Sequence, residues 1–322
     1  MQNGLLYHKV YDPTLEVHTL RIYIPIGGLR SFYYNGTKYR LPLRKSLLLL
    51  YHDSQFSGQH TSEADTFLKL SRQAWWPEMK QAVHDWVSTC AVCKLCKPQR
   101  GLTTEQRTAL ADRPFKTLYV DTIGPISPSD DSFKYVIHAS CPFSHFCWLG
   151  AVEDLQAETV ARWLAENVFL DLCGFPAVLR CDRGQEYTSD LVKSLNDRFG
   201  VEQCFGAAFH PEAQAHVEGS HQRVNAIIKA YTDATKHWAR WIKVAQWSMR
   251  ATPRHDLGGF SPFEVITGMQ PQGPVERLFI RPSTGYQDAA TYVNDLQHQL
   301  KNIHHTVSVQ IHADYVKRVK EQ

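Results

Sequence analysis

The sequence has no strong excess of charge of one sign, no long apolar run and no dense set of cysteines. Its 322 residues carry 35 Lys and Arg against 32 Asp and Glu, a net charge of +3, so any nucleic-acid site must be a local patch. The longest aliphatic run is four leucines at residues 47–50, whereas a membrane span needs about 18 apolar residues. We therefore expect no membrane association. The first residues show no apolar stretch typical of a signal peptide. Eight cysteines in such a chain favour metal ligands or core residues over a disulfide framework.

What the sequence does contain is enough apolar surface for a sizeable core. It is 43% hydrophobic and 11% aromatic, which excludes global disorder. The length is about twice the ~150 residues expected of one domain, which predicts two or more domains.

The hydrophobic pattern changes several times along the chain. Alternation at residues 18–25 and 36–41 predicts small strands. A helical period begins after Ser62, and Pro77 fits the first turn of a second helix. Residues 97–113 have little apolar content and predict a linker. Beyond it we expect strands at 118–120, 135–139, 147–152 and 177–181, and helices at 159–173, 189–199, 238–251 and around 292–303.

Two histidines and two cysteines predict a zinc site at residues 52–93. His52 and His60 have seven residues between them, and Cys90 and Cys93 form a Cys-x2-Cys pair after 29 more. Two imidazoles and two thiolates complete a tetrahedral shell with no open position, so the zinc would be structural. A two-helix unit of about 45 residues is near the size at which small domains need such a metal. Cys96 repeats the spacing after Cys93 and remains an alternative ligand.

Three carboxylates predict a second metal site. Asp121 and Asp182 each end a strand-like run, and Glu218 follows Asp182 after 35 residues. Acidic residues past neighbouring strand ends can converge with a glutamate carried by a helix. Such a cluster offers the hard oxygen ligands that Mg²⁺ prefers, and two ions about 4 Å apart can promote an in-line phosphoryl displacement. Glu186 and Glu212 are interpreted as solvated loop charges.

The two constellations together resemble the integrases of retroviruses and LTR retrotransposons, most closely those of the gypsy type. The resemblance covers about residues 4–310 and rests on the zinc ligands, on the D-D-35-E spacing and on local signatures. These signatures are Trp76-Pro77-x-Met79, Asp121-x-x-Gly124-Pro125, Asp182-Arg183-Gly184-x-Glu186-Tyr187-Thr188-Ser189, His210-Pro211 and Gly259-x-Ser261-Pro262-Phe263-Glu264.

The resemblance implies an α/β fold class: an RNase H-like core with a mixed five-stranded sheet and helices on both faces. It implies a β-rich N-terminal extension at 1–50, a His2Cys2 zinc-binding domain at 51–97, a linker at 98–113, the catalytic core at 114–275 and a C-terminal linker-helix region at 276–322. Relatives usually continue into a small basic β-barrel, and we expect none within this sequence. A fragment, a degenerate copy and a host-adopted derivative all remain open.

The implied activity joins the 3′ ends of retroelement cDNA to host target DNA, using two Mg²⁺ or Mn²⁺ ions held by Asp121, Asp182 and Glu218 beside one structural Zn²⁺. The expected partners are both DNAs, further copies of the chain in a homo-oligomer and a possible chromatin-tethering protein. The implied localisation is a cytoplasmic particle before integration and the nucleus for the integration step. The alternative is an inactive or host-adopted relic that serves as a DNA- or protein-binding module.

A helix bearing Glu218 is expected to present one stripe to DNA. Val217, Val224 and Ile228 recur at helical spacing as its core side. The adjacent stripe, which faces the metals with Glu218, resembles the family's contacts to the DNA end. Its candidate DNA-binding residues are Gln214, His221, Gln222, Arg223, Asn225 and Lys229. Gly219, Gln222 and Asn225 stand where relatives often have a basic residue, which predicts weaker phosphate contacts.

Overall fold

The computed structural model describes most of the chain and divides it into two units. The described residues are 5–12, 17–34, 37–54, 57–96, 112–126, 132–171, 174–182, 184–205, 224–225, 238–273 and 288–320. Unit 1 comprises Met1–Lys97, Ala251–His255 and Gly259–Ile303, and unit 2 comprises Pro98–Arg250, Asp256–Gly258 and His304–Gln322. Parts of the segment 251–275, which the sequence interpretation assigned to the catalytic core, thus belong to unit 1. The five-part domain division stays a prediction.

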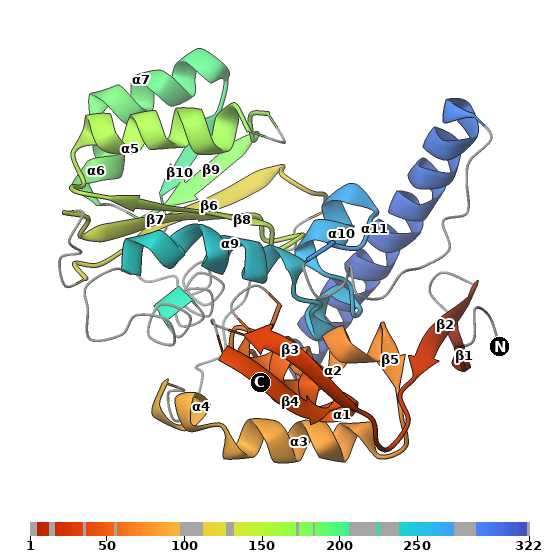
Figure 1. The fold of residues 1–322 in the computed structure, drawn as a ribbon. Coiled ribbons are helices and arrows are strands. Elements are labelled where there is room, and N and C mark those ends of the chain that lie inside the picture. Colours follow the sequence, from red (N-terminus) through yellow and green to blue (C-terminus); the bar gives the residue numbers. More distant parts are fainter. Residues whose placement is uncertain are drawn as a thin grey trace. The chain divides into compact units, whose positions relative to one another are not determined.

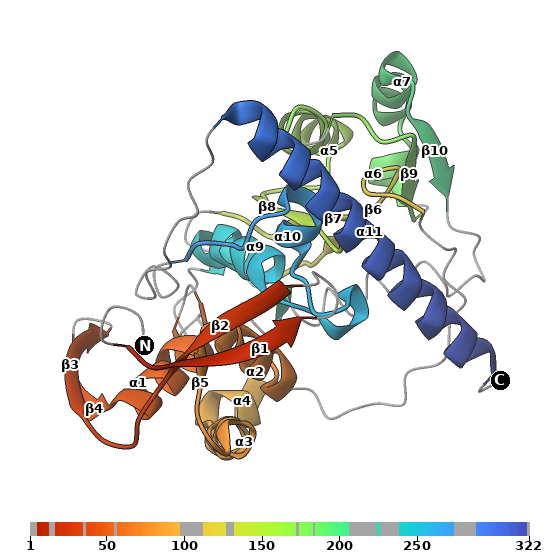
Figure 2. The same cartoon turned by 90° about the vertical axis from the view of Figure 1, so that its right-hand side faces the viewer.

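Unit 1 begins with two small β-structures, as the alternating runs predicted (Figure 2). β1 (Tyr7–Asp12) pairs antiparallel with β2 (Val17–Tyr23), and the short β5 (Ala74–Trp75) adds to β2 in parallel. β3 (Leu29–Tyr34) and β4 (Thr37–Pro42) form a separate hairpin.

Helices of unit 1 pack around an apolar core. They are α1 (Leu43–Leu48), the π-helical turn η1 (Leu49–Asp53), α2 (Glu63–Ser71), α3 (Met79–Thr89) and α4 (Ala91–Cys96). Ser62 caps α2, because its hydroxyl accepts the Asp65 N–H at 3.1 Å. Pro77 lies two residues before α3 rather than in its first turn. The core buries Ile24, Leu47, Leu48, Tyr51, Leu70, Ala74, Trp76, Met79, Val83 and Val87.

The later segments supply a short helix to unit 1 and a long one to both units. α10 (Pro262–Thr267) starts with a capping box of Ser261 and Glu264 and ends at Gly268. Arg72 pairs with Glu264, which ties α10 to the end of α2 within unit 1. After the 3-10 turn η4 (His255–Leu257) and α10, the helix α11 (Ala289–Lys320) closes the chain. No helix among the described residues is long and apolar enough to cross a membrane.

Unit 2 is built on a mixed five-stranded sheet. Its strands are β6 (Thr117–Ile123), β7 (Tyr135–Ser140), β8 (Cys147–Val152), β9 (Val178–Cys181) and β10 (Glu202–Phe205). Their order is β10-β9-β6-β7-β8. β7 is antiparallel to both β6 and β8, β9 is parallel to β6, and β10 is parallel to β9. This order places β6 at the centre, as in an RNase H-like fold, and confirms the predicted fold class.

Helices cover both faces of this sheet (Figure 1). One face carries α5 (Ala157–Leu164), its π-helical continuation η2 (Ala165–Phe169), α6 (Gln185–Thr188) and α7 (Asp190–Phe199). Gly150 of β8 allows α5 to approach, since a Cβ there would stand 1.8 Å from Nε1 of Trp163. The other face carries the 3-10 turn η3 (Trp238–Trp241) and α9 (Ile242–Ala251).

Helix α9 also covers the edge strand β8. Nζ of Lys243 donates to the Leu149 carbonyl at 2.9 Å, and Nε of Arg250 donates to the Cys147 carbonyl at 2.7 Å. Oε1 of Gln246 accepts the Leu149 N–H at 2.8 Å. These side chains satisfy backbone groups that an edge strand otherwise exposes.

Candidate functional site

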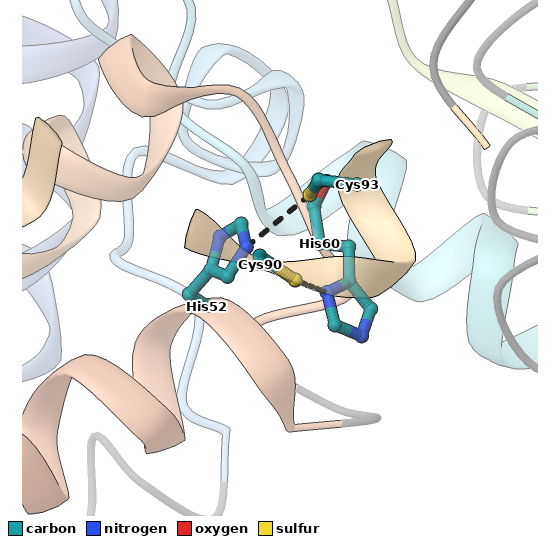
Figure 3. Close-up of side chains that lie close together, drawn as sticks. All are labelled: His52, His60, Cys90 and Cys93. Atoms are coloured by element: carbon teal, nitrogen blue, oxygen red, sulfur yellow. Dashed lines mark hydrogen bonds between the residues drawn. The ribbon is translucent and has the colours of Figure 1, made fainter. Parts of the chain in front are cut away.

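The four predicted zinc ligands lie together in unit 1 (Figure 3). His52 is in η1, His60 is in the following loop, and Cys90 and Cys93 lie just before and within α4. Nε2 of His52 is 3.3 Å from Sγ of Cys93, and Nδ1 of His60 is 3.3 Å from Sγ of Cys90. One donor atom from each residue lies within 4.8 Å of all the others.

These separations fit one tetrahedral zinc ion. With Zn–N bonds of about 2.0–2.1 Å and Zn–S bonds of about 2.3 Å, neighbouring donor atoms stand about 3.4–3.8 Å apart. Two imidazoles and two thiolates occupy all four positions and leave none for a substrate. The donor set therefore suits a structural zinc that fastens η1 and its loop to α4.

Local contacts orient the two histidines. Nδ1 of His52 lies 3.3 Å from Oγ1 of Thr66, and a proton on Nδ1 leaves Nε2 free to bind the metal. His60 has a left-handed backbone with φ 50°, and its N–H donates to the His52 carbonyl at 2.7 Å. Gly58 packs against that same backbone, since a Cβ there would stand 2.4 Å from the His52 carbonyl carbon. The return of His60 to His52 thus requires glycine at position 58.

Asp53 is a neighbour of the zinc site that the sequence interpretation did not include. Its Oδ1 lies 3.7 Å from Nδ1 of His60 and 3.9 Å from Sγ of Cys90, and its Oδ2 accepts the Trp86 indole N–H at 2.8 Å. Burial raises the pKa of the Asp53 carboxyl, while the hydrogen bonds from Trp86 and Cys90 act in the opposite direction. Its position directly after His52 was the one signal in the sequence.

Two of the three predicted catalytic carboxylates follow neighbouring strand residues in unit 2. In the parallel ladder of β6 and β9, Val120 pairs with Cys181. The next residues along the two strands are Asp121, which is half-buried, and Asp182, which is exposed. The register therefore places the two aspartates side by side at one edge of the sheet. Asp182 follows the end of β9, as expected, whereas Asp121 lies within β6, which continues to Ile123.

The environment of Asp121 disfavours its charged form. Burial raises the pKa of Asp121 to about 6, with further contributions from the charges of Asp182 and Glu186. The Thr122 N–H, which donates to Oδ1 of Asp121 at 2.7 Å, acts in the opposite direction. A bound cation would relieve both the desolvation and the repulsion.

Glu186 differs from its interpretation as a solvated loop charge. It is half-buried on α6, and its Oε1 accepts the Thr122 hydroxyl at 3.3 Å. Its charge also contributes to the raised pKa of Asp121. The contact with Thr122 could not be predicted from the sequence, because the approach of Glu186 to β6 depends on how α6 packs.

The carboxylates of Asp121 and Asp182 suit Mg²⁺ or Mn²⁺, which prefer carboxylate oxygens. Glu218, the third predicted ligand, lies outside the described residues. Within the described part of the chain, the zinc set is the one group of three or more His, Cys, Asp or Glu donors at metal-binding spacing. Asp121 and Asp182 are thus the two predicted magnesium ligands that the described residues contain, and the magnesium site stays a prediction.

Most of the predicted DNA-binding stripe also lies outside the described residues: Gln214, His221, Gln222, Arg223 and Lys229. Asn225 is described and is half-buried in a helical segment beside Val224. Val224 is fully buried in a core cluster with Ile123, Val136 and Trp238, as its place on the core side of the helix predicted.

A comparison with known protein families agrees with the zinc site. Residues 41–99 match the integrase zinc binding domain. The chain is 24% identical over 227 residues to the retrovirus-related Pol polyprotein from transposon 412 of Drosophila melanogaster, covering 70% of this chain and 18% of that protein. It is 25% identical over 235 residues to KRAB-A domain-containing protein 2 of Homo sapiens, covering 70% of this chain and 46% of that protein.

A solved structure with a similar segment is the catalytic core domain of BIV integrase. It is 18% identical, with a TM-score of 0.40, and the match covers 47% of this chain and 93% of that one. The chain spans less than half the length of either relative.

Proposed function

We propose that this chain, a relative of retroviral-type integrases with an integrase zinc-binding domain, is a polynucleotidyl transferase. Its reaction would join the 3′ ends of retroelement cDNA, of a gypsy-type element, to host DNA. The observation that carries the proposal is the register of β6 and β9, which brings Asp121 and Asp182 to one edge of an RNase H-like sheet.

Asp121, Asp182 and Glu218 would hold the divalent metal ions. When bound, two such ions would supply the Lewis-acid chemistry needed for a DNA 3′ oxygen to attack a target phosphodiester and for the leaving oxygen to depart. The half-buried Asp121 carboxylate provides a poorly solvated negative charge, which favours metal binding over solvation. Asp182, exposed at the strand end, lies where DNA can approach. Glu218 is assigned from the spacing of the motif alone.

The zinc site has a structural role in this proposal. It holds the loop of His60 and the start of α4 together and has no open position for chemistry. The active form would be a homo-oligomer, because two cDNA ends must be joined in one event. A chromatin-tethering partner and a nuclear site for the integration step complete the proposal.

A strand-transfer assay tests the function. The purified chain would be incubated with a short duplex donor, a plasmid target and Mg²⁺ or Mn²⁺. Asp182→Asn removes a metal ligand at nearly constant shape, so it should abolish joining while fold and DNA binding persist. Asp197→Asn is the control, since Asp197 is an exposed aspartate on α7. If joining occurs and Asp182→Asn retains all of it, the assignment of the site is wrong.

A second candidate is a non-catalytic DNA- or protein-binding module. It is favoured by the similarity to a human protein named for a KRAB-A domain rather than as a Pol polyprotein. Gln222 and Asn225, at positions that are often basic in relatives, also fit this alternative. Metal-independent DNA binding without any strand transfer would support it.

A further inference from the structure

We propose that Gln203 is a positioning residue for Asp182. Gln203 lies on β10, which flanks β9 on the side away from β6. Nε2 of Gln203 donates to the Tyr187 carbonyl at 2.8 Å and lies 3.4 Å from Sγ of Cys181. The inference rests on the proposed function, because it assigns a role to Gln203 in holding a metal ligand.

The two contacts enclose the segment that carries Asp182. Cys181 directly precedes Asp182, and Tyr187 directly follows Glu186. Inside the segment, the Gly184 N–H donates to Oδ1 of Asp182, and the Tyr187 N–H donates to the Gly184 carbonyl, both at 3.0 Å. The turn is therefore closed by its own hydrogen bonds, and Gln203 connects both of its ends to the sheet.

Gln203 is itself held in one orientation. The Tyr187 carbonyl can only accept, so the amide nitrogen of Gln203 must face it. Its Oε1 then faces Asn196, whose Nδ2 donates to it at 3.1 Å. Asn196 is fully buried on α7. A flip of either amide group would place two donors or two acceptors against each other. Neither side chain can therefore flip without losing a hydrogen bond.

A second tie holds the same segment from the opposite side. The Thr122 hydroxyl of β6 donates to Oε1 of Glu186 at 3.3 Å. α6 is thus anchored to β6 through Thr122 and to β10 through Gln203, and Asp182 lies on the turn between β9 and α6. Metal sites need their ligands held within about 0.5 Å. The Gln203 contacts therefore set how well Asp182 is placed for a cation shared with Asp121.

Two matched variants test this role in the full-length protein. Gln203→Met keeps the length of the side chain and removes its hydrogen bonds. Gln246→Met is the control, because Gln246 makes a 2.8 Å hydrogen bond to β8 at the far edge of the same sheet. Mn²⁺ binding would be measured by electron paramagnetic resonance, and amide exchange at Tyr187 and Thr188 by NMR.

The expected result is a Kd for Mn²⁺ that rises about three- to tenfold in Gln203→Met, at the low end of the effects of outer-shell contacts. Exchange at Tyr187 and Thr188 should also accelerate. Strand transfer should need more metal, with its rate largely restored at saturating metal. Gln246→Met should change none of these, although it lowers the melting temperature to a similar degree. If Gln203→Met does not fold, Asn196→Leu can replace it, because it removes the hydrogen-bond partner of Gln203 Oε1. This variant should raise the Kd for Mn²⁺ and the exchange rate at Tyr187 and Thr188 by smaller amounts.

Unchanged metal affinity and exchange in Gln203→Met, or equal shifts in the two glutamine variants, would overturn the positioning role. A wild-type protein that binds no Mn²⁺ would instead contradict the proposed function. In that case the exchange at Tyr187 and Thr188 still decides whether Gln203 holds the segment: faster exchange supports the tie, and unchanged exchange refutes it.

Discussion

Replacement of Asp121 by asparagine should stabilise the folded, zinc-loaded protein when no Mg²⁺ is bound. Burial, helped by the charges of Asp182 and Glu186, raises the pKa of this carboxyl from 3.8 to about 6. The folded state therefore binds the Asp121 proton more tightly than the unfolded chain does. At neutral pH the group is ionised in both states, and its poor solvation costs folding free energy. Asparagine removes the charge and keeps an oxygen for the Thr122 N–H, which donates to Oδ1 at 2.7 Å.

The size of the stabilisation by Asp121→Asn follows from the shift in the pKa of Asp121. A pKa difference of about two units corresponds to about 3 kcal/mol. Because the Asp121 side chain is only half-buried, solvent screening reduces the expected gain to about 1–2 kcal/mol. The direction of the pH dependence follows from linkage. Between pH 3.8 and 6 the folded wild type binds more protons at Asp121 than the unfolded chain does, so its stability falls as the pH rises through this range. The advantage of Asp121→Asn should be full above pH 6, about half by pH 5 and absent well below pH 3.8.

Urea unfolding of the zinc-loaded protein without Mg²⁺, at pH 7.5 and pH 5.0, measures this difference. Asp182→Asn is the matched control, because Asp182 is exposed and its charge is a smaller cause of the shift than burial. Asp182→Asn should therefore stabilise less than Asp121→Asn. Added Mg²⁺ should stabilise the wild type and should fail to stabilise Asp121→Asn. A gain that is independent of pH, or one that is larger for Asp182→Asn, would refute the reasoning.

The zinc site and the Glu218 helix give the remaining predictions. Metal analysis should find one Zn²⁺ per chain, and Cys93→Ser should unfold residues 52–93 while sparing unit 2; well-folded protein without zinc would contradict this. Gly58→Ala should weaken zinc binding in a chelator competition, because its Cβ would clash with the His52 backbone; Gly174→Ala, whose Cβ would meet nothing within 4 Å, is a control that should leave zinc affinity unchanged. Gln222→Lys with Asn225→Lys should tighten binding of a fluorescent donor duplex and steepen its log affinity–log salt slope by up to about two units. An unchanged slope would mean that this stripe does not meet DNA.

The strands and caps could be predicted because their signals are local. The runs at 135–139 and 147–152 lie within β7 and β8 with bounds differing by at most one residue. Ser62 caps its helix because a short hydroxyl side chain accepts a nearby backbone N–H, which needs no tertiary contact. The zinc ligands were found for a related reason: two histidines and two cysteines at two short spacings form a donor set that suits zinc.

The supporting contacts could not be predicted, because they depend on how distant elements pack. Glu186 was interpreted as a solvated loop charge, and only the approach of α6 to β6 gives it a hydrogen bond to Thr122. The tie from Gln203 to Tyr187 joins positions 16 residues apart. The predicted helix at 159–173 also changes character, since its part from Ala165 to Phe169 is a π-helical turn. Hydrophobic periodicity identifies a buried face but carries no information about hydrogen-bond geometry.

The zinc site and the proposed magnesium site place opposite demands on the fold. At the zinc site, four donors from one compact unit close the coordination shell, so metal binding adds directly to the stability of that unit. At the carboxylate edge, Asp121 carries a charge that the metal-free fold solvates poorly, so the site costs stability until a cation arrives. The desolvation that raises the pKa of Asp121 to about 6 is also what makes a bound cation more favourable there than in water. Because neutralising Asp121 would stabilise the magnesium-free fold, its carboxylate fits the proposed enzyme better than the proposed binding module.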